Sequence, residues 1–172
     1  MFFDLPKNFK FYKYISSGYH GDIYLVYDTS YKILKVFNDI KVGKNETLIV
    51  SKLKHPNIIS HIKSYSYLKY WCIEMPYYQK GSLYSRLLRT TISDNECAKW
   101  LKQLKSAIYY MHQLKYTHND LKLNNILLDV DNNVVIIDFG CALENTYNFT
   151  DDINSLENIQ YKFKNKKIAS KL

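Results

Sequence analysis

The order of hydrophobic and polar residues changes once along the chain, at about Pro76. Before that proline, short stretches rich in β-branched and aromatic residues alternate with turn residues, which is typical of β-strands. One helix is expected among them, with Leu48, Ile49 and Leu53 on one face, ending before His55-Pro56. The predicted strands are residues 9–16, 23–27, 31–37, 62–67 and 70–75, and the predicted helix is residues 44–53.

After Pro76 the hydrophobic spacing becomes helical. The longest helix begins at the capping residues Ser93, Asp94 and Asn95, and its buried face is expected to carry Leu101, Leu104, Ile108 and Met111. The pattern predicts an α+β fold: a single domain with a β-rich lobe over about residues 1–76, a helical lobe over about 77–163 and a Lys-rich tail, 164–172. The other predicted elements are helices at 82–88 and 152–163 and strands at 125–128 and 134–137, which flank a turn at 131–133.

The composition is that of a soluble globular protein. Of the 172 residues 47% are hydrophobic and 16% aromatic, which excludes a disordered chain. The longest aliphatic run, residues 134–137, is too short to cross a bilayer, and the first residues lack the pattern of a signal peptide. The three cysteines include no C-x-x-C pair, which argues against a disulfide framework and a structural zinc site. A reducing compartment, the cytoplasm, is therefore expected.

The net charge of +8 resembles that of a nucleic-acid-binding protein, but its make-up argues against that function. Of the 24 Lys and Arg residues only Arg86 and Arg89 are arginines, whereas arginine is the residue best suited to bidentate phosphate recognition. Abundant Lys, Asn, Ile and Tyr with few Gly is the bias that an A/T-rich genome imposes through its codons. We therefore expect no dedicated nucleic-acid binding.

Two candidate sites lie in the strand-rich part. Ser16-Ser17-Gly18-Tyr19-His20-Gly21-Asp22-Ile23 stands between two predicted strands, where glycine lets backbone N–H groups approach phosphate oxygens; a plain hairpin turn is the alternative. Lys35 stands in an apolar strand, where an ammonium group is costly without an anion nearby. Glu46 on the following helix is its candidate partner, and a solvent-facing lysine is the alternative.

Two more candidate sites follow the long helix. In the segment from His118 to Asn125, Asp120 offers a carboxylate to a hydroxyl proton, Asn125 an amide oxygen to a hard cation, and Lys122 a positive charge between them. Asp138-Phe139-Gly140 follows directly on the apolar strand at 134–137, so that its carboxylate requires a partner or a metal ion.

Taken in order, these four sites resemble the signature set of eukaryotic-type protein kinases: the Gly-rich loop, the strand lysine, the helix glutamate, the H-R-D-L-K-x-x-N loop and the D-F-G turn. Plainer stretches agree as well. They are the His55-Pro56-Asn57-Ile58 segment, the segment after the hinge at Tyr77–Leu83, and the helix that begins at Asp152. The similarity covers about residues 9–163. It implies a two-lobed kinase-like fold with a five-stranded antiparallel sheet, one N-lobe helix and a shortened helical C-lobe.

The resemblance also implies a role for each matched residue. Asp120 would be the catalytic base, Lys122 would contact the γ-phosphate of ATP, and Asn125 and Asp138 would bind Mg²⁺. Lys35, oriented by Glu46, would hold the α- and β-phosphates. Met75 is the expected gatekeeper; the alternative register makes it Ile73, with Glu74 as the next residue. The remaining expected ATP-binding residues are Ser16, Gly18, Gly21, Ile23, Ile33, Met75, Pro76, Tyr77 and Leu127.

The chain departs from the kinase pattern in five places. Ser16 replaces the first loop glycine, Ile33 a small alanine beside the adenine, and Asn119 the arginine that reads a phosphorylated activation loop. Only eleven residues, 141–151, separate Gly140 from Asp152, so the activation segment is expected to be deleted. The later large-lobe helices are expected to be missing. Such shortened kinases resemble the minimal kinases of viruses and bacterial effectors, for which host cytoplasm or nucleus is the expected location.

Two functions follow from the resemblance. The first is an ATP- and Mg²⁺-dependent Ser/Thr protein kinase that acts on protein hydroxyls without activation-loop control, since all six charged or polar chemical positions are present. The alternative is a pseudokinase-like binding module that engages or inhibits a host kinase or signalling protein. Ile33 and the missing substrate platform favour that alternative. The expected partner is thus a protein substrate or a host signalling protein.

Overall fold

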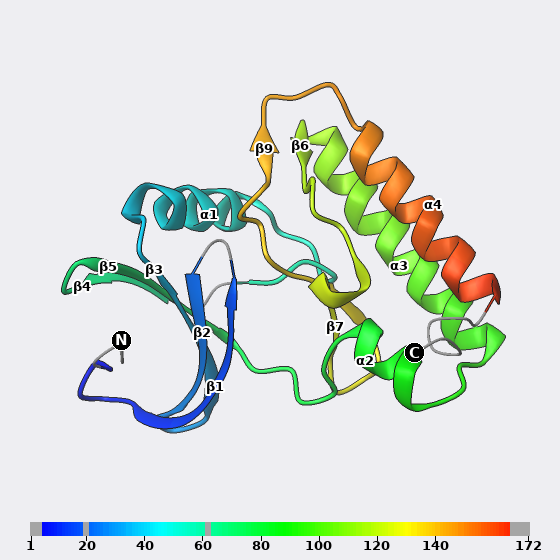
Figure 1. The fold of residues 1–172 in the computed structure, drawn as a ribbon. Coiled ribbons are helices and arrows are strands. Elements are labelled where there is room, and N and C mark those ends of the chain that lie inside the picture. Colours follow the sequence, from blue (N-terminus) through cyan, green and yellow to red (C-terminus); the bar gives the residue numbers. More distant parts are fainter. Residues whose placement is uncertain (1–4, 19–20, 61–62, 166–172) are drawn as a thin grey trace. The chain divides into compact units, whose positions relative to one another are not determined.

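The computed structural model describes residues 5–18, 21–60 and 63–165, and its internal contacts divide the chain into two units. The first unit holds the described residues up to Lys52 and those within Ser60–Tyr77. The second holds Leu53–Ile59 and the described residues from Tyr78 onward. Figure 1 traces both along the chain, from blue at the start to red at the end.

A five-stranded antiparallel sheet and one helix form the first unit (Figure 1). The strands lie in the spatial order β1-β2-β3-β5-β4, so the third strand along the chain is the central one. The prediction of five strands and one helix in this part is confirmed. Its elements are β1 (Lys10–Gly18), β2 (Gly21–Tyr27), β3 (Tyr31–Phe37), α1 (Ile40–Lys52), β4 (Lys63–Tyr67) and β5 (Tyr70–Pro76).

The two faces of this sheet carry different side chains. Residues two apart on a strand, and residues directly opposite on neighbouring strands, share a face. One face carries Tyr24, Val26, Leu34, Val36 and Cys72, which form a core cluster with Phe9, the residue before β1. The other face therefore carries Ile23, Ile33 and Lys35, which are the sequence candidates for nucleotide binding.

Helix α1 differs from its prediction in two respects. It begins at Ile40 rather than at residue 44, because the Asp39 carboxylate accepts hydrogen bonds from the N–H groups of Lys41 (2.8 Å) and Val42 (3.4 Å) and so caps its first turn. Leu48, expected on the buried face, is 48% exposed. The buried residues are Gly43, Glu46, Ile49 and Val50. A Cβ at position 43 would meet the Phe37 and Trp71 rings, so glycine lets the helix approach the sheet closely.

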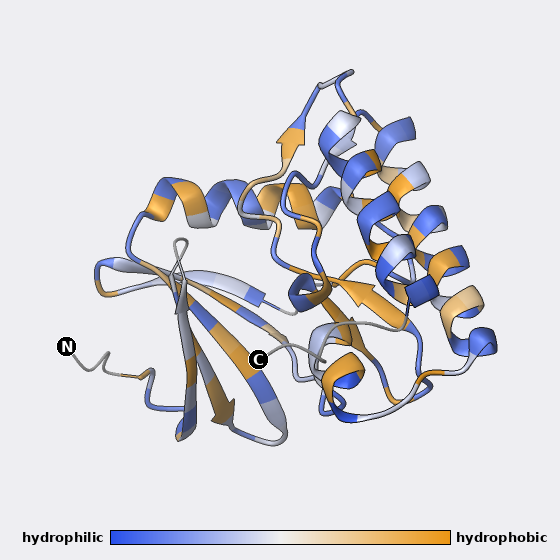
Figure 2. Cartoon of the chain, turned by 45° about the vertical axis from the view of Figure 1, so that its right-hand side comes forward, coloured by the Kyte–Doolittle hydropathy of each residue, from blue (hydrophilic) through white to orange (hydrophobic). Residues whose placement is uncertain are grey.

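The second unit is mainly helical. Helices α3 and α4 lie side by side in both ribbon views (Figures 1 and 2), and the rings of Trp100 and Phe163 join them at a centroid distance of 5.9 Å. Figure 2 shows hydrophobic and hydrophilic residues mixed along both helices, as expected when one side of each is buried. The helices are α2 (Leu83–Arg89), α3 (Asp94–Gln113), α4 (Thr150–Asn165) and the short 3-10 helix η1 (Leu123–Asn125).

Helix α3 begins as predicted. The Ser93 side chain accepts a hydrogen bond from the Glu96 N–H, and the Glu96 carboxylate accepts one from the Ser93 N–H, which is a capping box. The predicted residues Leu104, Ile108 and Met111 are buried, whereas Leu101 is only half-buried. Cys97, Trp100 and Ala107 complete the buried face.

Four short strands form two separate pairs in the second unit. β7 (Ile126–Leu128) and β8 (Val134–Ile136) form the predicted hairpin, one residue shorter at its outer ends than expected. β6 (Tyr116–Thr117) pairs with β9 (Leu143–Glu144), and neither strand was predicted, because two residues are too few to show an alternating pattern.

The segment Leu53–Ile59 belongs to the second unit and forms hydrogen bonds with β8 and α3. The N–H of Ile59 donates to the Ile136 carbonyl, and the Ile136 N–H donates to the Asn57 carbonyl, each at 2.9 Å. The side chain of Asn57 donates to the Val134 carbonyl at 2.7 Å. No helix within residues 5–18, 21–60 and 63–165 is both long enough and apolar enough to cross a membrane.

Candidate active site

The Gly-rich turn connects β1 to β2. Gly18 and Gly21 are its paired ends, and Gly21 has a φ of 143°, a conformation that side chains disfavour. A Cβ at Gly21 would also collide with the carbonyl of Val36, so only glycine fits there, whereas a Cβ at Gly18 would make ordinary contacts. Tyr19 and His20, the middle of the predicted loop, lie outside the described residues.

Lys35 and Glu46 form a buried ion pair in the first unit. The Lys35 Nζ donates to both carboxylate oxygens of Glu46, at 2.9 and 2.8 Å, and each residue is 3% exposed. The ring of Phe37 lies beneath the ammonium group, 4.9 Å from Nζ to its centroid. A solvent-facing Lys35 is therefore excluded. The cost of desolvating both charges offsets much of the attraction within a buried ion pair. The main consequence of the Lys35–Glu46 pair is therefore that both side chains are fixed in place.

The adenine-binding candidates of the first unit occupy adjacent register positions. Ile23 lies opposite Lys35, and Ile33 lies opposite Met75. Ile73, the alternative gatekeeper, lies opposite Lys35 on the same face. β5 continues through Pro76, which pairs with Lys32, while Tyr77 contacts Tyr31 at a ring distance of 6.3 Å.

Asp120, Lys122 and Asn125 meet in the second unit. The Lys122 Nζ donates to the Asp120 carboxylate at 2.9 and 2.7 Å, and the Asn125 amide nitrogen donates to the Asp120 carboxylate and carbonyl, each at 2.9 Å. The Asp120 side chain is 33% exposed, so its oxygens are held but accessible. Leu127, the remaining adenine candidate, is half-buried in β7 opposite Val135.

A buried carboxylate that no motif assigned as functional holds this loop. Asp152, 0% exposed in the first turn of α4, accepts hydrogen bonds from the backbone N–H groups of His118 and Asn119 and from the His112 Nε2, all at 2.9 Å. The loop and its anchor are 34 residues apart, so only the resemblance of the Asp152 helix to a kinase helix pointed to this position.

The imidazole of His118 connects the same loop to the segment after β8. The Asp120 N–H donates to Nδ1 at 3.2 Å, which makes Nδ1 an acceptor and places the ring proton on Nε2, which donates to the Ile137 carbonyl at 3.0 Å. The ring also packs against Phe139 at 4.9 Å. Burial lowers the pKa of His118 from 6.5, in agreement with a neutral ring.

Asp138, the residue after Ile137, has an unusual backbone conformation. Its φ is 66°, in the left-handed region that few non-glycine residues adopt and that is often found at functional sites. The Ile137 N–H donates to the Asn125 carbonyl at 2.9 Å, which joins the segment before Asp138 to the loop that carries Asn125. Asn119, with a φ of 60°, donates from its side chain to the Cys141 carbonyl at 3.1 Å. Asparagine tolerates this conformation better than most residues.

The chemistry of Asn125 and Asp138 fits a magnesium ion. The Asn125 amide nitrogen is engaged by Asp120, which fixes the orientation of its oxygen, and Asp138 adds a carboxylate; both are hard oxygen donors. Within the described part of the chain, no three His, Cys, Asp or Glu side chains group closely enough to hold a metal ion. Mg²⁺ suits such a sparse set, because it is commonly bound by one or two carboxylates together with substrate phosphates.

The eleven-residue segment after Gly140 is held to the loop region by several contacts. β9 pairs with β6, the Tyr116 hydroxyl donates to Glu144 at 2.9 Å, and the Thr146 N–H donates to the Lys115 carbonyl at 3.1 Å. The Lys115 Nζ donates to the Tyr147 hydroxyl at 2.6 Å. The segment is thus ordered by hydrogen bonds among unmodified residues.

The neutral, buried His118 predicts a pH-dependent stability. In the unfolded chain this histidine binds a proton near pH 6.5, but in the folded chain only at lower pH. The free energy of unfolding should therefore fall as the pH drops below about 6.5, by at most about 1.4 kcal/mol per pH unit for this group. Burial lowers the pKa of His55 as well, which acts in the same direction.

Urea unfolding between about pH 7 and pH 5 would measure this slope. A His118→Gln variant should be less stable near neutral pH and should show a shallower slope, because the titrating group is gone. A free energy of unfolding that is constant over this interval would contradict the prediction.

Comparison with known proteins agrees with the observed fold. Residues 9–157 match the family model described as the protein kinase domain. NUAK family SNF1-like kinase 2 of Homo sapiens is 30% identical over 155 residues, which cover 84% of this chain and 24% of that protein. A probable serine/threonine-protein kinase KIN1 homolog of Enterocytozoon bieneusi (strain H348) is 34% identical over 118 residues, 68% of this chain and 19% of that protein. The chain spans about a quarter or less of the length of these curated relatives. On the match of its domain and on these similarities, the chain belongs to the protein kinase family, of the eukaryotic Ser/Thr type.

Proposed function

We propose that the chain is an ATP- and Mg²⁺-dependent Ser/Thr protein kinase that acts on protein hydroxyl groups without activation-loop control. The observation that carries the proposal is that the charged residues expected to act in catalysis are present and held in place by hydrogen bonds. The Lys35–Glu46 pair is intact, and Asp120 is held by Lys122 and Asn125. A chain that had lost catalysis would have no use for two separate polar arrangements, one of them a costly buried ion pair.

In this proposal each residue has one chemical task. Asp120 accepts the proton of the substrate hydroxyl while the hydroxyl oxygen forms a bond to the γ-phosphorus of ATP. The bond between that phosphorus and the β,γ-bridging oxygen breaks, which releases ADP. Lys122 balances negative charge on the transferred group, and Lys35, oriented by Glu46, binds the α- and β-phosphates. Asn125 and Asp138 would hold Mg²⁺, which supplies positive charge to the phosphates when bound.

The absence of activation-loop control is supported by the segment after Gly140. Kinases that need loop phosphorylation use an arginine to bind the phosphate, and here that position is Asn119. Its side chain donates to the Cys141 carbonyl instead, and β9 pairs with β6. We infer that direct hydrogen bonds replace the phosphate-dependent contact, so that the enzyme needs no activating phosphorylation.

Transfer of labelled γ-phosphate from ATP to a mixture of histones, with and without Mg²⁺, tests this function. We expect Mg²⁺-dependent transfer by the wild-type chain, a rise in its melting temperature with ATP and Mg²⁺, and transfer by Asp138→Asn at background level. If wild-type transfer does not exceed that of Asp138→Asn and ATP does not raise the melting temperature, the alternative of a pseudokinase-like binding module stands instead. Transfer only after a second protein is added would make activity partner-dependent.

Ile33 provides a separate prediction about nucleotide affinity. It lies on the Lys35 face of the sheet, opposite Met75, where a small residue is usual in this family. Ile33→Ala removes bulk next to the expected adenine position, and we expect ATP to bind about fivefold more tightly. Isothermal titration with ATP and Mg²⁺ would measure this change, with Ile153→Ala on the exposed side of α4 as a matched control. An unchanged or weakened affinity would show that Ile33 does not restrict the nucleotide.

A further inference from the structure

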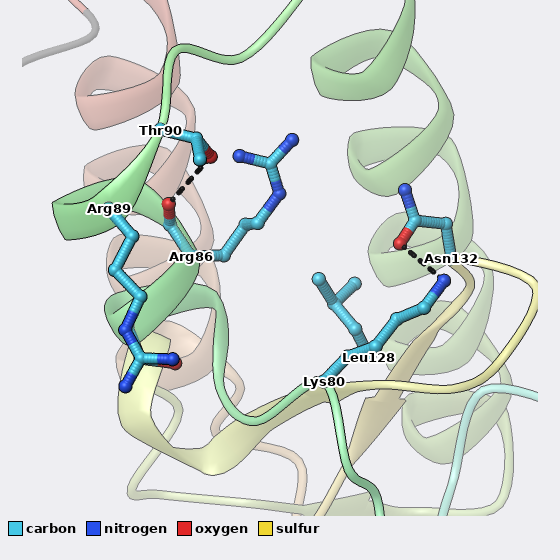
Figure 3. Close-up of a pocket in the computed structure, with 7 residues that line it drawn as sticks. Lys80, Arg86, Arg89, Thr90, Leu128 and Asn132 are labelled. Atoms are coloured by element: carbon cyan, nitrogen blue, oxygen red, sulfur yellow. Dashed lines mark hydrogen bonds between the residues drawn. The ribbon is translucent and has the colours of Figure 1, made fainter.

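A cavity of about 360 Å³ lies in the second unit, between α2 and the turn that joins β7 to β8 (Figure 3). It is separate from Asp120, Asn125 and Asp138, none of which lines it. The residues that line it are Lys80, Ser85, Arg86, Arg89, Thr90, Leu128 and Asn132. We call it the α2 pocket.

Positive charge is concentrated in the α2 pocket. Three of its lining residues are cations and none is an anion, and they include both arginines of a chain whose other basic residues are lysines. A codon bias that favours lysine explains neither Arg86 nor Arg89. Arginine differs from lysine in its planar fork of donors, which matches the oxygens of a phosphate or carboxylate.

The partners of the three cations leave two charges unbalanced. Arg86 is paired with Glu96 at 3.1 Å. The Lys80 Nζ donates to the Asn132 Oδ1 at 3.1 Å (Figure 3). It also donates to the Val130 carbonyl at 2.7 Å; both acceptors are neutral, so Lys80 is held in position but keeps its charge. The exposed side chain of Arg89 has no hydrogen-bond or ion-pair partner among the residues that the structure describes.

The carboxylates of Glu96 and Asp129 form no ion pair with Lys80 or Arg89 among the described residues. Glu96 is bound to Arg86 and to the N-cap of α3, and the Asp129 carboxylate accepts from the N–H groups of Asp131 and Asn133 within the β7–β8 turn. Leu128, 1% exposed, is the apolar part of the lining. The pocket therefore offers two positive charges, those of Lys80 and Arg89, that form no ion pair within the described residues.

We propose that the α2 pocket binds a phosphorylated serine or threonine side chain on a segment of a partner protein. A phosphate monoester carries nearly two negative charges at neutral pH, which Lys80 and Arg89 together would balance, and its oxygens suit the arginine fork. Figure 3 draws the exposed Arg89 side chain pointing away from Lys80, so Arg89 would turn to reach a phosphate held at Lys80. The volume admits the phosphorylated side chain together with part of a neighbouring residue. This binding requires neither ATP nor phosphoryl transfer and does not depend on the proposed kinase activity.

The scarcity of arginine makes the test direct. In a ¹H–¹⁵N correlation spectrum of the whole chain, the arginine Nε–H region should contain only the signals of Arg86 and Arg89, and an Arg89→Lys variant would assign them. The probe is a degenerate peptide library with phosphoserine at a fixed central position, and matching libraries carry serine or glutamate there. Inorganic phosphate is the fourth probe.

We expect the phosphoserine library to shift both arginine signals and the serine library to shift neither. By fluorescence anisotropy with the labelled phosphoserine library, Arg89→Gln should weaken binding about tenfold. Lys105→Gln on the exposed side of α3, which removes the same charge, should leave binding unchanged.

Three results would overturn the proposal: no shift with the phosphoserine library, equal shifts with the serine library, or equal weakening by Lys105→Gln. Equal affinity for inorganic phosphate would reduce the pocket to a general anion site, and equal affinity for the glutamate library would make it a site for acidic segments; both exclude phosphopeptide recognition. Because no ATP is present, these results stand whether or not the chain transfers phosphate.

Discussion

Replacement of Asp120 by asparagine is expected to lower the rate of phosphoryl transfer by about 10²–10³-fold. Asparagine has nearly the same size, so it can still accept a hydrogen bond from Lys122 or Asn125. It cannot take up a proton, because the amide is far less basic than a carboxylate. The loss should appear in kcat, with little change in the affinity for ATP, since the expected ATP-binding residues are other side chains.

A steady-state assay with labelled ATP would measure the loss, and the melting temperature of each protein would confirm that it is folded. Asp131→Asn is the matched control: it makes the same chemical change in an exposed residue of the β7–β8 turn. We expect this control to retain wild-type activity. If Asp120→Asn keeps more than about a third of the wild-type rate, Asp120 is not the proton acceptor and the proposed mechanism is wrong.

The sheet of the first unit was predictable because its strands are long enough to show their character. Residues 31–37 were predicted without error, and the other four strands within two residues at each described end. Helix α1 was predicted less well. Ile40, Val42 and Gly43 are poor helix formers, so the first turn is hidden from a pattern argument and depends on the Asp39 cap. The pattern places Leu48 on the buried face because nearly adjacent apolar residues fit more than one face, but Leu48 is exposed.

The residues of the candidate site were predictable as motifs, but their mutual positions were not. Family resemblance and the cost of an unpaired buried ammonium group predict that Lys35 pairs with Glu46, and the structure places them in contact. The role of Asp152 could not be read from local sequence, because two of its three hydrogen-bond donors are backbone N–H groups, which nearly every residue has, and the third, His112, lies 40 residues away. The same holds for β6 and β9, whose pairing joins residues far apart in the chain.

Asp152→Asn is expected to be strongly destabilising, by about 3 kcal/mol. The carboxylate of Asp152 accepts on both oxygens: Oδ1 from the Asn119 N–H, and Oδ2 from the His118 N–H and His112. An asparagine has one acceptor oxygen and one NH₂ group. In either orientation of the amide, an NH₂ group faces a backbone N–H that cannot change its role, so at least one buried donor is left unpaired. For a chain of this size the melting temperature should fall by roughly 6–12 °C.

The neighbouring Asp151 separates this effect from the general preference of a helix start for negative charge. Both aspartates lie in the first turn of α4, but Asp151 is exposed. Asp151→Asn should therefore cost only about 0.3–1 kcal/mol, the value of a charge near the end of a helix dipole. Thermal unfolding of the two variants would measure the difference, and equal losses would show that Asp152 acts only through the dipole.

Because Asp152 fixes the two residues before Asp120, phosphoryl transfer by Asp152→Asn should be reduced even well below its melting temperature, whereas Asp151→Asn should retain full activity. A fully active Asp152→Asn in the folded state would mean that the loop keeps its catalytic geometry without this anchor, and that the buried carboxylate stabilises the fold alone.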